Sequence, residues 1–429
     1  MLSEWNACYL YYEILLSVTI IREKGTYIMT NKVNKRNSII VVFAIFAISI
    51  NMRPAITSIG PMLETIRQQL SLSNAQVSLL TSVPVICMGI FATLAPVLKR
   101  RFGLKHTMYT MIILVGVMTA LRGIVTGFLV LFGTAFIIGI AIAIMGPLLS
   151  AMIKQNFPDR AASVIGIYSF GMGVGASASA GLTAVFYNIT GSYQFALSIW
   201  ALLAFVGIAV WFIAMRDTNV VRQAKPILSV EKRTTSISPW KTKKAWLFLL
   251  FFGMQSSAFF SIITWLAPIA LSAGMTLLQA GTLLSLMTVV QIFLNLLLPL
   301  LMQRFPARKF WLLLMLMAGI VATGLFWTGI HPLMWAGAIL MGIPLGGLFP
   351  VALLLPLDET DTAEETNTWT AMMQTGGYII GGLFPLLIAL VHDWTTNHHY
   401  TFIIFIVLYV VMICLTFLIG DKQIKTNVH

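Results

Sequence analysis

Charged side chains are scarce in this sequence of 429 residues. Asp, Glu, Lys and Arg together make up 10% of the chain, and only 14 residues are acidic. A soluble globular domain has about a quarter charged residues, so this chain is not expected to fold in water. Hydrophobic residues instead reach 58%, and the mean hydropathy is +0.89. These values predict an integral membrane protein with several spanning segments.

Cysteine is also scarce, and its placement excludes two further classes of protein. Cys8, Cys87 and Cys414 lie in separate apolar segments without CxxC or Cys/His spacing, so neither a disulfide framework nor a metal site is predicted. We expect no cofactor. The formal charge of +13 would suit a nucleic-acid partner, but the basic residues form short clusters between apolar runs, as membrane topology requires. No nucleic-acid binding is therefore predicted.

Twelve apolar runs approach or exceed the roughly 20 residues that a spanning helix needs. They lie at about 38–62, 75–98, 106–124, 127–153, 162–186, 193–214, 245–272, 276–302, 309–330, 332–356, 366–391 and 399–420. The runs predict an all-α membrane protein with two six-helix halves, at 36–215 and 245–421, joined by a polar linker at 216–244. Residues 1–35 form an N-terminal extension, in which Met29 opens a basic segment that could be the true start of translation.

Lysine and arginine are distributed unevenly between the two sides of the predicted bundle. If the first helix starts in the cytoplasm, 22 of these residues fall in inner segments and two, Arg67 and Arg122, fall in outer loops. Cytoplasmic loops are the ones enriched in Lys and Arg. Both termini are therefore predicted to be cytoplasmic.

The two predicted halves match each other at a constant shift of 203 residues. The stretch "LAPVLKRRFGLKH" from Leu94 aligns with "LLPLLMQRFPARK" from Leu297. Further like residues coincide at the same shift: Gln76 with Gln279, Ser82 with Ser285, Gly139 with Gly342 and Pro147 with Pro350. Such a match predicts a duplicated six-helix unit.

Four phrases resemble the cyanate porter and nitroimidazole transporter subfamily of the major facilitator superfamily. They are "NMRPAITSIGP" from Asn51, "GIAIAIMGPLLSAMIKQNFP" from Gly139, "GMQSSAFFSIITWLAPIAL" from Gly253 and "MMQTGGYIIGGLFPLLIALVHD" from Met372. The resemblance covers about residues 36–420. It implies the major facilitator fold and transport of small anions or small polar heterocycles by alternating access, with the substrate site between the halves. We expect a monomer in the bacterial plasma membrane, with a small-molecule substrate and the lipid bilayer as its partners.

The chain departs from the superfamily in the loop after the second helix. The usual G-x-x-x-D-R-x-G signature has Pro96 at the glycine position and Arg100 at the acidic position. The ionic contact between halves that usually involves this aspartate is therefore not implied here.

Arg53 lies inside the first predicted helix. About 15 residues precede it in that apolar run, which places it roughly 20 Å from the inner boundary at 1.5 Å per residue. A charge at this depth costs several kcal/mol unless it faces a polar cavity or a partner. The nearest carboxylate in the sequence is Glu64, three turns further out. An unpaired arginine with its planar fork of donors suits a small anion; pairing with Glu64 or with backbone carbonyls is the alternative.

Asn51 and Pro54 flank this arginine. Proline removes a backbone donor, so Pro54 should free a carbonyl near Ile50 and kink the helix. Asn51 lies about 200° around the helix from Arg53, so the two cannot both point straight into a cavity. Asn51 is predicted either to present its amide to the substrate or to satisfy the freed backbone.

The resemblance places the seventh and eleventh helices at the substrate cavity. Four residues on them complete the predicted substrate site: Gln255, Trp265, Gln374 and Tyr378. Gln374 and Tyr378 are four residues apart and share a helix face. Hydrogen bonding between helices is the alternative for the polar residues, and packing or an interfacial position is the alternative for Trp265. For Gln291 and Asn295 we expect the helix-to-helix role.

These features favour a secondary carrier for a small anionic or weakly acidic solute, similar to cyanate, nitrite or a carboxylate. The second interpretation is an exporter of small neutral heterocycles or drugs, in which Arg53 is structural. An enzyme such as an acyl- or phosphotransferase would need an acid/base pair or metal ligands near the membrane, and no convincing set is present, so no catalytic residue is predicted. No Asp, Glu or His is predicted at mid-membrane, so we expect transport to be driven by the solute's own gradient, by exchange, or by a proton carried on the anion.

Overall fold

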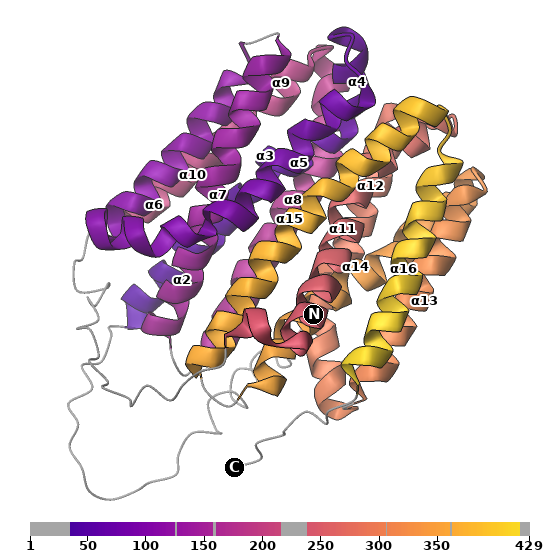
Figure 1. The fold of residues 1–429 in the computed structure, drawn as a ribbon. Coiled ribbons are helices and arrows are strands. Elements are labelled where there is room, and N and C mark those ends of the chain that lie inside the picture. Colours follow the sequence, from indigo (N-terminus) through magenta and orange to yellow (C-terminus); the bar gives the residue numbers. More distant parts are fainter. Residues whose placement is uncertain are drawn as a thin grey trace, which may run out of the picture. The chain divides into compact units, whose positions relative to one another are not determined.

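The structure, a computed structural model, describes residues 35–124, 127–157, 160–215, 238–305, 307–360 and 363–420. Every regular element in these ranges is helical. The predicted extension, up to residue 34, and most of the predicted linker, at 216–237, lie outside the described residues. The first half contains α2 (Lys35–Met52), α3 (Pro54–Thr57), α4 (Ile59–Gln69), α5 (Asn74–Phe91), the 3₁₀ turn η1 (Ala92–Leu94), α6 (Ala95–Leu121), α7 (Phe128–Asn156), α8 (Ala161–Thr190), α9 (Tyr193–Ser198) and α10 (Ala201–Ala214) (Figure 1).

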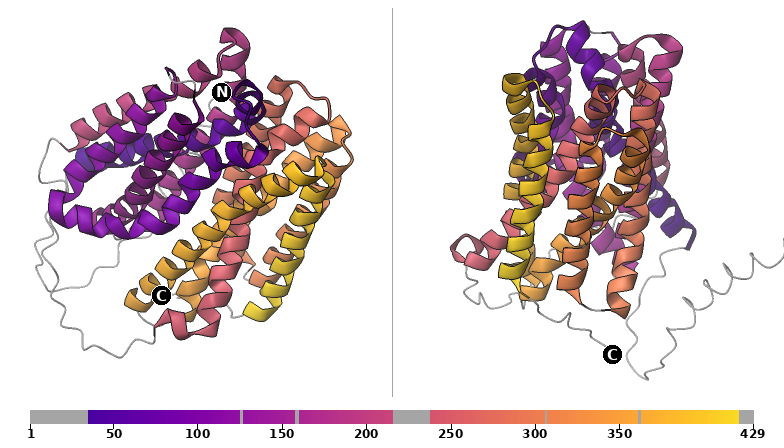
Figure 2. Two further views of the ribbon diagram at one scale, coloured as in Figure 1. Left: turned by 45° about the horizontal axis from the view of Figure 1, so that its top comes forward. Right: turned by 90° about the vertical axis from the view of Figure 1, so that its right-hand side faces the viewer.

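The second half is built from longer and less interrupted helices. They are η3 (Pro239–Lys241), α11 (Lys243–Ser272), α12 (Leu277–Arg304), α13 (Arg308–Trp327), α14 (His331–Glu359), α15 (Ala363–Thr395) and α16 (His399–Ile419). The indigo-to-magenta helices of the first half lie beside the orange-to-yellow helices of the second half (Figure 2, left).

Eleven helical segments of the described chain are long and apolar enough to cross a membrane. One of them, Asn74–Leu121, has 48 residues. At 1.5 Å per residue it would extend about 72 Å, more than twice the roughly 30 Å of a hydrocarbon core. Gly103 interrupts this segment with φ of +76°, a conformation that glycine adopts without the steric cost of a Cβ atom. The twelve crossings expected from the sequence remain a prediction, with Gly103 as the residue that would separate two of them.

The 203-residue repeat has a counterpart in how the helices begin. The Ser73 hydroxyl accepts a hydrogen bond from the Gln76 backbone N–H, and the Gln76 side chain accepts one from the Ser73 N–H. Thr276 and Gln279 form the same capping box at the start of α12. Each box satisfies two backbone donors at a helix start, so the two halves use one device at equivalent positions.

Helix packing follows the same repeat. A Cβ atom on Gly139 of α7 would lie 2.9 Å from the Cβ of Cys87 on α5. A Cβ atom on Gly342 of α14 would lie 2.6 Å from the Cβ of Val290 on α12. Both glycines permit close approach of two helices, as small residues do in membrane proteins, and both contacts recur at the 203-residue shift.

The halves meet mainly along two pairs of helices, α5 against α15 and α8 against α12, and α4 adds a further contact with α11. Between α8 and α12, the hydroxyl oxygens of Ser177 and Ser285 are 3.1 Å apart. A Cβ atom on Gly173 would collide with Cγ1 of Ile292. Small side chains therefore bring α8 and α12 close together across the boundary.

The first membrane segment is broken at Arg53. Helix α2 ends at Met52, and α3 starts at Pro54, which has no N–H to donate to the Ile50 carbonyl. That carbonyl instead lies against Gly175 of α8, where a Cβ atom would collide with its oxygen. The kink predicted from Pro54 is present, and Gly175 is the residue that makes room for it.

At one end of the molecule, α4 packs across the boundary between the halves against α11. Buried apolar residues form one cluster within the first half, between residues 41 and 215. The other cluster fills the second half and includes four residues of α4: Ile59, Met62, Leu63 and Ile66. A Cβ atom on Gly60 of α4 would lie 2.5 Å from the Ile263 carbonyl oxygen on α11. We call the region formed by α4, the start of α5 and the ends of α11 and α15 the sealed end.

Candidate substrate cavity between the two halves

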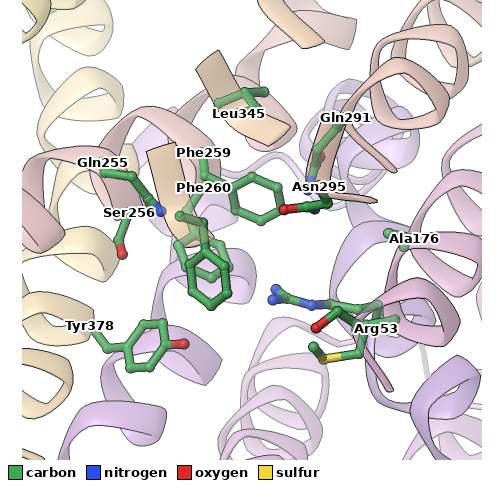
Figure 3. A pocket seen from close by; sticks show the side chains of 14 residues that line it. Arg53, Ala176, Gln255, Ser256, Phe259, Phe260, Gln291, Asn295, Leu345 and Tyr378 are labelled. Carbon is green, nitrogen blue, oxygen red and sulfur yellow. The ribbon is translucent and has the colours of Figure 1, made fainter. Parts of the chain in front are cut away.

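A cavity lies between the two halves beside the break in the first membrane segment. Its walls come from the α2–α3 break and α8 in the first half, and from α11, α12, α14 and α15 in the second (Figure 3). Among the residues that line it, Arg53 is the one charged residue. The polar lining residues are Arg53, Ser169, Gln255, Ser256, Gln291, Asn295 and Tyr378.

The guanidinium of Arg53 points into this cavity and contacts aromatic rings of the opposite half. Its Cζ atom lies 5.4 Å from the ring centroid of Phe259 and 5.7 Å from that of Phe260, both on α11. Figure 3 shows the Tyr378 hydroxyl facing the cavity from the other side. A cation over an aromatic face gains about 0.5–2 kcal/mol, less than the several kcal/mol that a charge at this depth costs. The rings alone therefore leave part of the charge uncompensated.

Pairing of Arg53 with Glu64, one of the two structural roles considered from the sequence, is wrong. The Glu64 carboxylate accepts hydrogen bonds from Arg67, at 2.6 and 2.9 Å, and from Gln68, at 2.6 Å. Nη1 of Arg53 is buried and has no hydrogen-bond partner. Across the described residues, no hydrogen bond joins its guanidinium to a carboxylate or a backbone carbonyl.

Gln255 and Tyr378, both predicted from the sequence as substrate-site residues, line the same cavity as Arg53. Gln255 is 5% exposed, and its Oε1 atom is buried without a hydrogen-bond partner. The Tyr378 ring packs edge-on against Phe252, with centroids 5.3 Å apart, and its hydroxyl faces the cavity. A buried acceptor without a partner is costly, so the amide of Gln255 is available to a ligand.

The other three predicted site residues lie outside the cavity lining. Asn51 is 3% exposed, and its Nδ2 atom lies next to Gly207 of α10, without a hydrogen-bond partner. Trp265 donates a hydrogen bond of 3.0 Å to the Pro385 carbonyl near the sealed end. Gln374 lies one helical turn from Tyr378 on α15 but does not line the cavity.

The described helices therefore combine a duplicated helical bundle with a cavity between its halves. The family model of the Major Facilitator Superfamily matches residues 38–385 and 262–428. The chain belongs to the Major Facilitator Superfamily. It is a multi-pass membrane transporter: composition predicted the membrane protein, and the family resemblance implied transport.

Three bacterial transporters are similar to this superfamily member over most of the chain. The uncharacterized transporter YycB of Bacillus subtilis (strain 168) is 29% identical over 391 residues, which are 88% of this chain and 92% of the relative. The cyanate transport protein CynX of Escherichia coli (strain K12) is 28% identical, over 83% and 91% of the two chains. The 2-nitroimidazole transporter of the same organism is 28% identical, over 84% and 90%. The subfamily resemblance drawn from the four sequence phrases is confirmed.

Solved structures of other transporters share the fold. A mutant form of the nucleoside transporter NupG superposes with a TM-score of 0.72 at 13% identity, over 89% of this chain and all of NupG. The inward open xylose transporter XylE from E. coli has a TM-score of 0.69 at 12% identity, over 91% and 97%. A bacterial homologue of Spinster in an inward-facing, occupied conformation has a TM-score of 0.70 at 17% identity, over 90% and 96%.

Several cavity residues of this superfamily member were missed or misassigned from sequence. Gln291 and Asn295, which the sequence analysis assigned to contacts between helices, line the cavity. Their spacing of four residues places them on one face of α12, which is a signal that could have been used. Phe259 and Phe260 offered no such signal, because aromatic residues fill many apolar positions in this helix.

Charged pairs of this transporter lie at helix ends, away from the cavity. Arg308 pairs with Asp358 at 2.8 Å, and Lys244 pairs with Glu359 at 2.6 Å. Glu64 pairs with Arg67 near the sealed end. Within the described residues, the cavity therefore holds one cation and is not lined by a carboxylate.

Proposed function

We propose that this transporter is a secondary carrier that moves a small anionic or weakly acidic solute across the plasma membrane by alternating access. Arg53 binds the anion, and Gln255 and Tyr378 contact it from the second half. The supporting observation is the Arg53 guanidinium in the cavity, which is held by two aromatic rings and has no carboxylate partner among the described residues. A guanidinium in this state keeps its in-plane N–H donors for a carboxylate-like or nitrite-like group.

The proposed topology has twelve crossings with both termini in the cytoplasm. Twelve crossings result when Gly103 separates two of them within the segment Asn74–Leu121. The excess of Lys and Arg in the segments at the opposite end from α4 supports a cytoplasmic position for that end. The sealed end is then the outer end.

Electrostatic attraction is large enough to select for charge. An anion about 4 Å from the guanidinium, at an effective dielectric constant of about 20, gains about 4 kcal/mol. The amides and hydroxyls that line the cavity add hydrogen bonds to the anion or to the rest of the solute. A cyanate-sized ion needs only Arg53 and one or two of these groups.

The second candidate is an exporter of small neutral heterocycles. It is supported by the aromatic rings in the cavity wall and by the similarity to the 2-nitroimidazole transporter. In this case Arg53 would have a structural role, and its charge would not influence solute binding. The two candidates therefore differ in the effect of replacing one side chain.

Transport does not require a proton relay through the protein in this proposal. The cavity is lined by neither histidine nor carboxylate, and such groups are the usual intramembrane proton carriers. The solute's own gradient, exchange, or a proton carried on the anion supplies the driving force. An imposed pH gradient should accelerate uptake only of solutes that can themselves be protonated.

Binding to purified protein tests the proposal directly. Thermal shift is measured with cyanate, nitrite, short carboxylates and 2-nitroimidazole, for the native protein and for Arg53→Ala, Arg53→Lys and Arg304→Ala. Loss of the charge should weaken anion binding by roughly a thousandfold, as about 4 kcal/mol implies. Arg53→Lys keeps the charge but lacks the planar fork of donors, so this variant should bind the anion about tenfold more weakly than the native protein.

Arg304 is the matched control, because it is an exposed arginine at the end of α12, and its removal changes the net charge equally. Anion binding that survives Arg53→Ala, or that falls as much in Arg304→Ala, would contradict the proposal. Arg53-independent binding of 2-nitroimidazole would support the second candidate.

A further inference from the structure

Asp393 at the end of α15 joins the two halves at the sealed end. Its Oδ1 atom accepts hydrogen bonds from the backbone N–H of Asn74, at 2.9 Å, and from the Asn74 side chain, at 2.8 Å. Its Oδ2 atom accepts one from the backbone N–H of Ala75, at 2.8 Å. Both oxygens of this second-half carboxylate are thus used by the start of α5 in the first half.

This contact completes the cap of α5. The first backbone N–H groups of a helix have no partner within the helix, and Ser73 satisfies only the one on Gln76. Asp393 accepts the N–H groups of the two residues before it, Asn74 and Ala75. A carboxylate at a helix N-terminus also interacts favourably with the helix dipole. Half of the cap of a first-half helix is therefore supplied by the second half.

The equivalent helix of the second half does not have such a contact in the described residues. Helix α12 has the same capping box, formed by Thr276 and Gln279. The residue 203 positions before Asp393 is Thr190, and its hydroxyl donates to the Phe186 carbonyl within α8. The Asp393 contact is therefore an addition to the repeat, on one side of the boundary.

The other hydrogen bonds described between α5 and the second half near this end join neutral groups. The Ser78 hydroxyl donates to the Pro385 carbonyl at 3.3 Å, and the Thr264 hydroxyl donates to that of Thr81 at 3.0 Å. Hydrogen bonds to an ionised group are shorter and about twice as strong as neutral ones. Asp393 thus makes the strongest polar contact described between these helices, and separation of the halves here must break it.

We propose that Asp393 is the outer gate residue of the transport cycle. Its carboxylate closes the sealed end by capping α5, and its release lets this end open. It acts through the position of α5 and does not contact the substrate. The assignment to the outer side rests on the topology in the proposed function, whereas the contact itself is independent of which solute is carried.

Asn74→Pro isolates this contact. The substitution removes the backbone donor and the side-chain donor of residue 74, which are two of the three hydrogen bonds to Asp393. Proline is well tolerated at the first position of a helix, and Ser73 before it has φ of −71° and ψ of 161°, which suit a residue that precedes proline. Leu277→Pro is the matched control, because Thr276 has φ of −71° and ψ of 159° and the described residues place no partner carboxylate at the start of α12.

Opening of the sealed end can be measured by thiol labelling. Ser82 of α5 is fully buried where this helix packs on α15, and its hydroxyl has no hydrogen-bond partner. A Ser82→Cys reporter, with the native cysteines replaced by alanine, is reacted with a membrane-impermeant maleimide added outside intact cells. We expect labelling to be about tenfold faster in Asn74→Pro and in Asp393→Asn, unchanged in Leu277→Pro, and close to native in Asp393→Glu, which keeps the charge.

The double variant Asn74→Pro/Asp393→Asn should label little faster than the faster single variant, because both changes remove one contact. The proposal would be overturned if both single variants label no faster than Leu277→Pro. It would also be overturned if the effects of the two changes add up in the double variant. Acceleration only when the reagent reaches the cytoplasmic face would overturn the assignment to the outer side. Labelling requires no solute, so failure of the anion proposal would leave this result unaffected.

Discussion

The two aromatic contacts of Arg53 allow a quantitative prediction. In the double variant Phe259→Leu/Phe260→Leu, the guanidinium keeps an apolar environment but loses both ring faces, which now lie 5.4 and 5.7 Å from its Cζ atom. Contacts of this kind contribute about 0.5–2 kcal/mol each. Phenylalanine rings in a cavity that also has polar walls belong to the lower part of that range, so the two together supply about 1.5 kcal/mol. This corresponds to roughly tenfold in Kd.

Anion affinity should therefore fall about tenfold in the leucine variant, because the guanidinium is no longer held where its N–H donors face the cavity. Isothermal titration or thermal shift with the best anion measures this change. Phe259→Tyr and Phe260→Tyr keep a ring face and should bind almost as tightly as the native protein. Phe349→Leu is the control, because Phe349 lines the same cavity and packs on Phe252 instead of on Arg53. Equal affinities of the leucine and native proteins, or equal losses in the tyrosine variants, would refute this reasoning.

Three further predictions concern stability. Gly175→Ala places a methyl group against the Ile50 carbonyl oxygen and should destabilise the protein by about 1–3 kcal/mol in a denaturant titration. Arg308→Ala removes the buried cation that pairs with Asp358 and should cost about 3–5 kcal/mol. His398 lies outside the spanning helices, and burial lowers its pKa to about 4. Its imidazole therefore binds a proton more readily in the unfolded chain than in the folded protein. The free energy of unfolding is unaffected by this group above about pH 6.5 and decreases as the pH falls from there toward 4. The thermal midpoint should thus decrease from about pH 7 to about pH 5, and less so in His398→Phe.

Each of these has a matched control in the same chain. Gly166→Ala, also in α8, meets no atom within 4 Å and should change stability little, so a loss equal to that of Gly175→Ala would contradict the steric explanation. Lys244→Ala removes a half-exposed partner of Glu359 and should cost under about 1 kcal/mol. His399→Phe alters the neighbouring histidine, and a pH dependence that changes only there would argue against His398.

The membrane segments and the break in the first of them could be predicted because both depend on local sequence. A run of about 20 apolar residues is a condition that the bilayer imposes on each helix separately. Proline disrupts the helix that contains it, so Pro54 indicated the kink without knowledge of any neighbour. The repeat was visible because like residues, such as Gln76 and Gln279, recur at one offset of 203 residues, and each of these glutamines caps the start of its own helix.

The cavity residues were predicted less well because they depend on contacts between distant parts of the chain. Gln255 and Tyr378 line the cavity, but Gln374, one turn away on the same helix face as Tyr378, does not, since one turn moves a side chain about 5.4 Å along the helix and the cavity occupies only part of that length. Asn51 and Arg53 are divided by the break, and Asn51 lies against α10. Phe259 and Phe260 are about 200 residues from Arg53 in the sequence and contact it only in the folded protein. The sequence pattern of one helix does not indicate which residues of another helix it will contact.

The amino-acid sequence by itself determined that this chain is a duplicated helical membrane transporter with a cation at the depth of the bilayer. Hydropathy, proline and basic residues act on each segment through the lipid, which is the same for every helix. The tertiary structure decided which groups surround that cation and which carboxylate caps α5 at the sealed end. Both outcomes depend on how two halves approach each other, and close approach is set by glycines and small side chains that fit one particular neighbour.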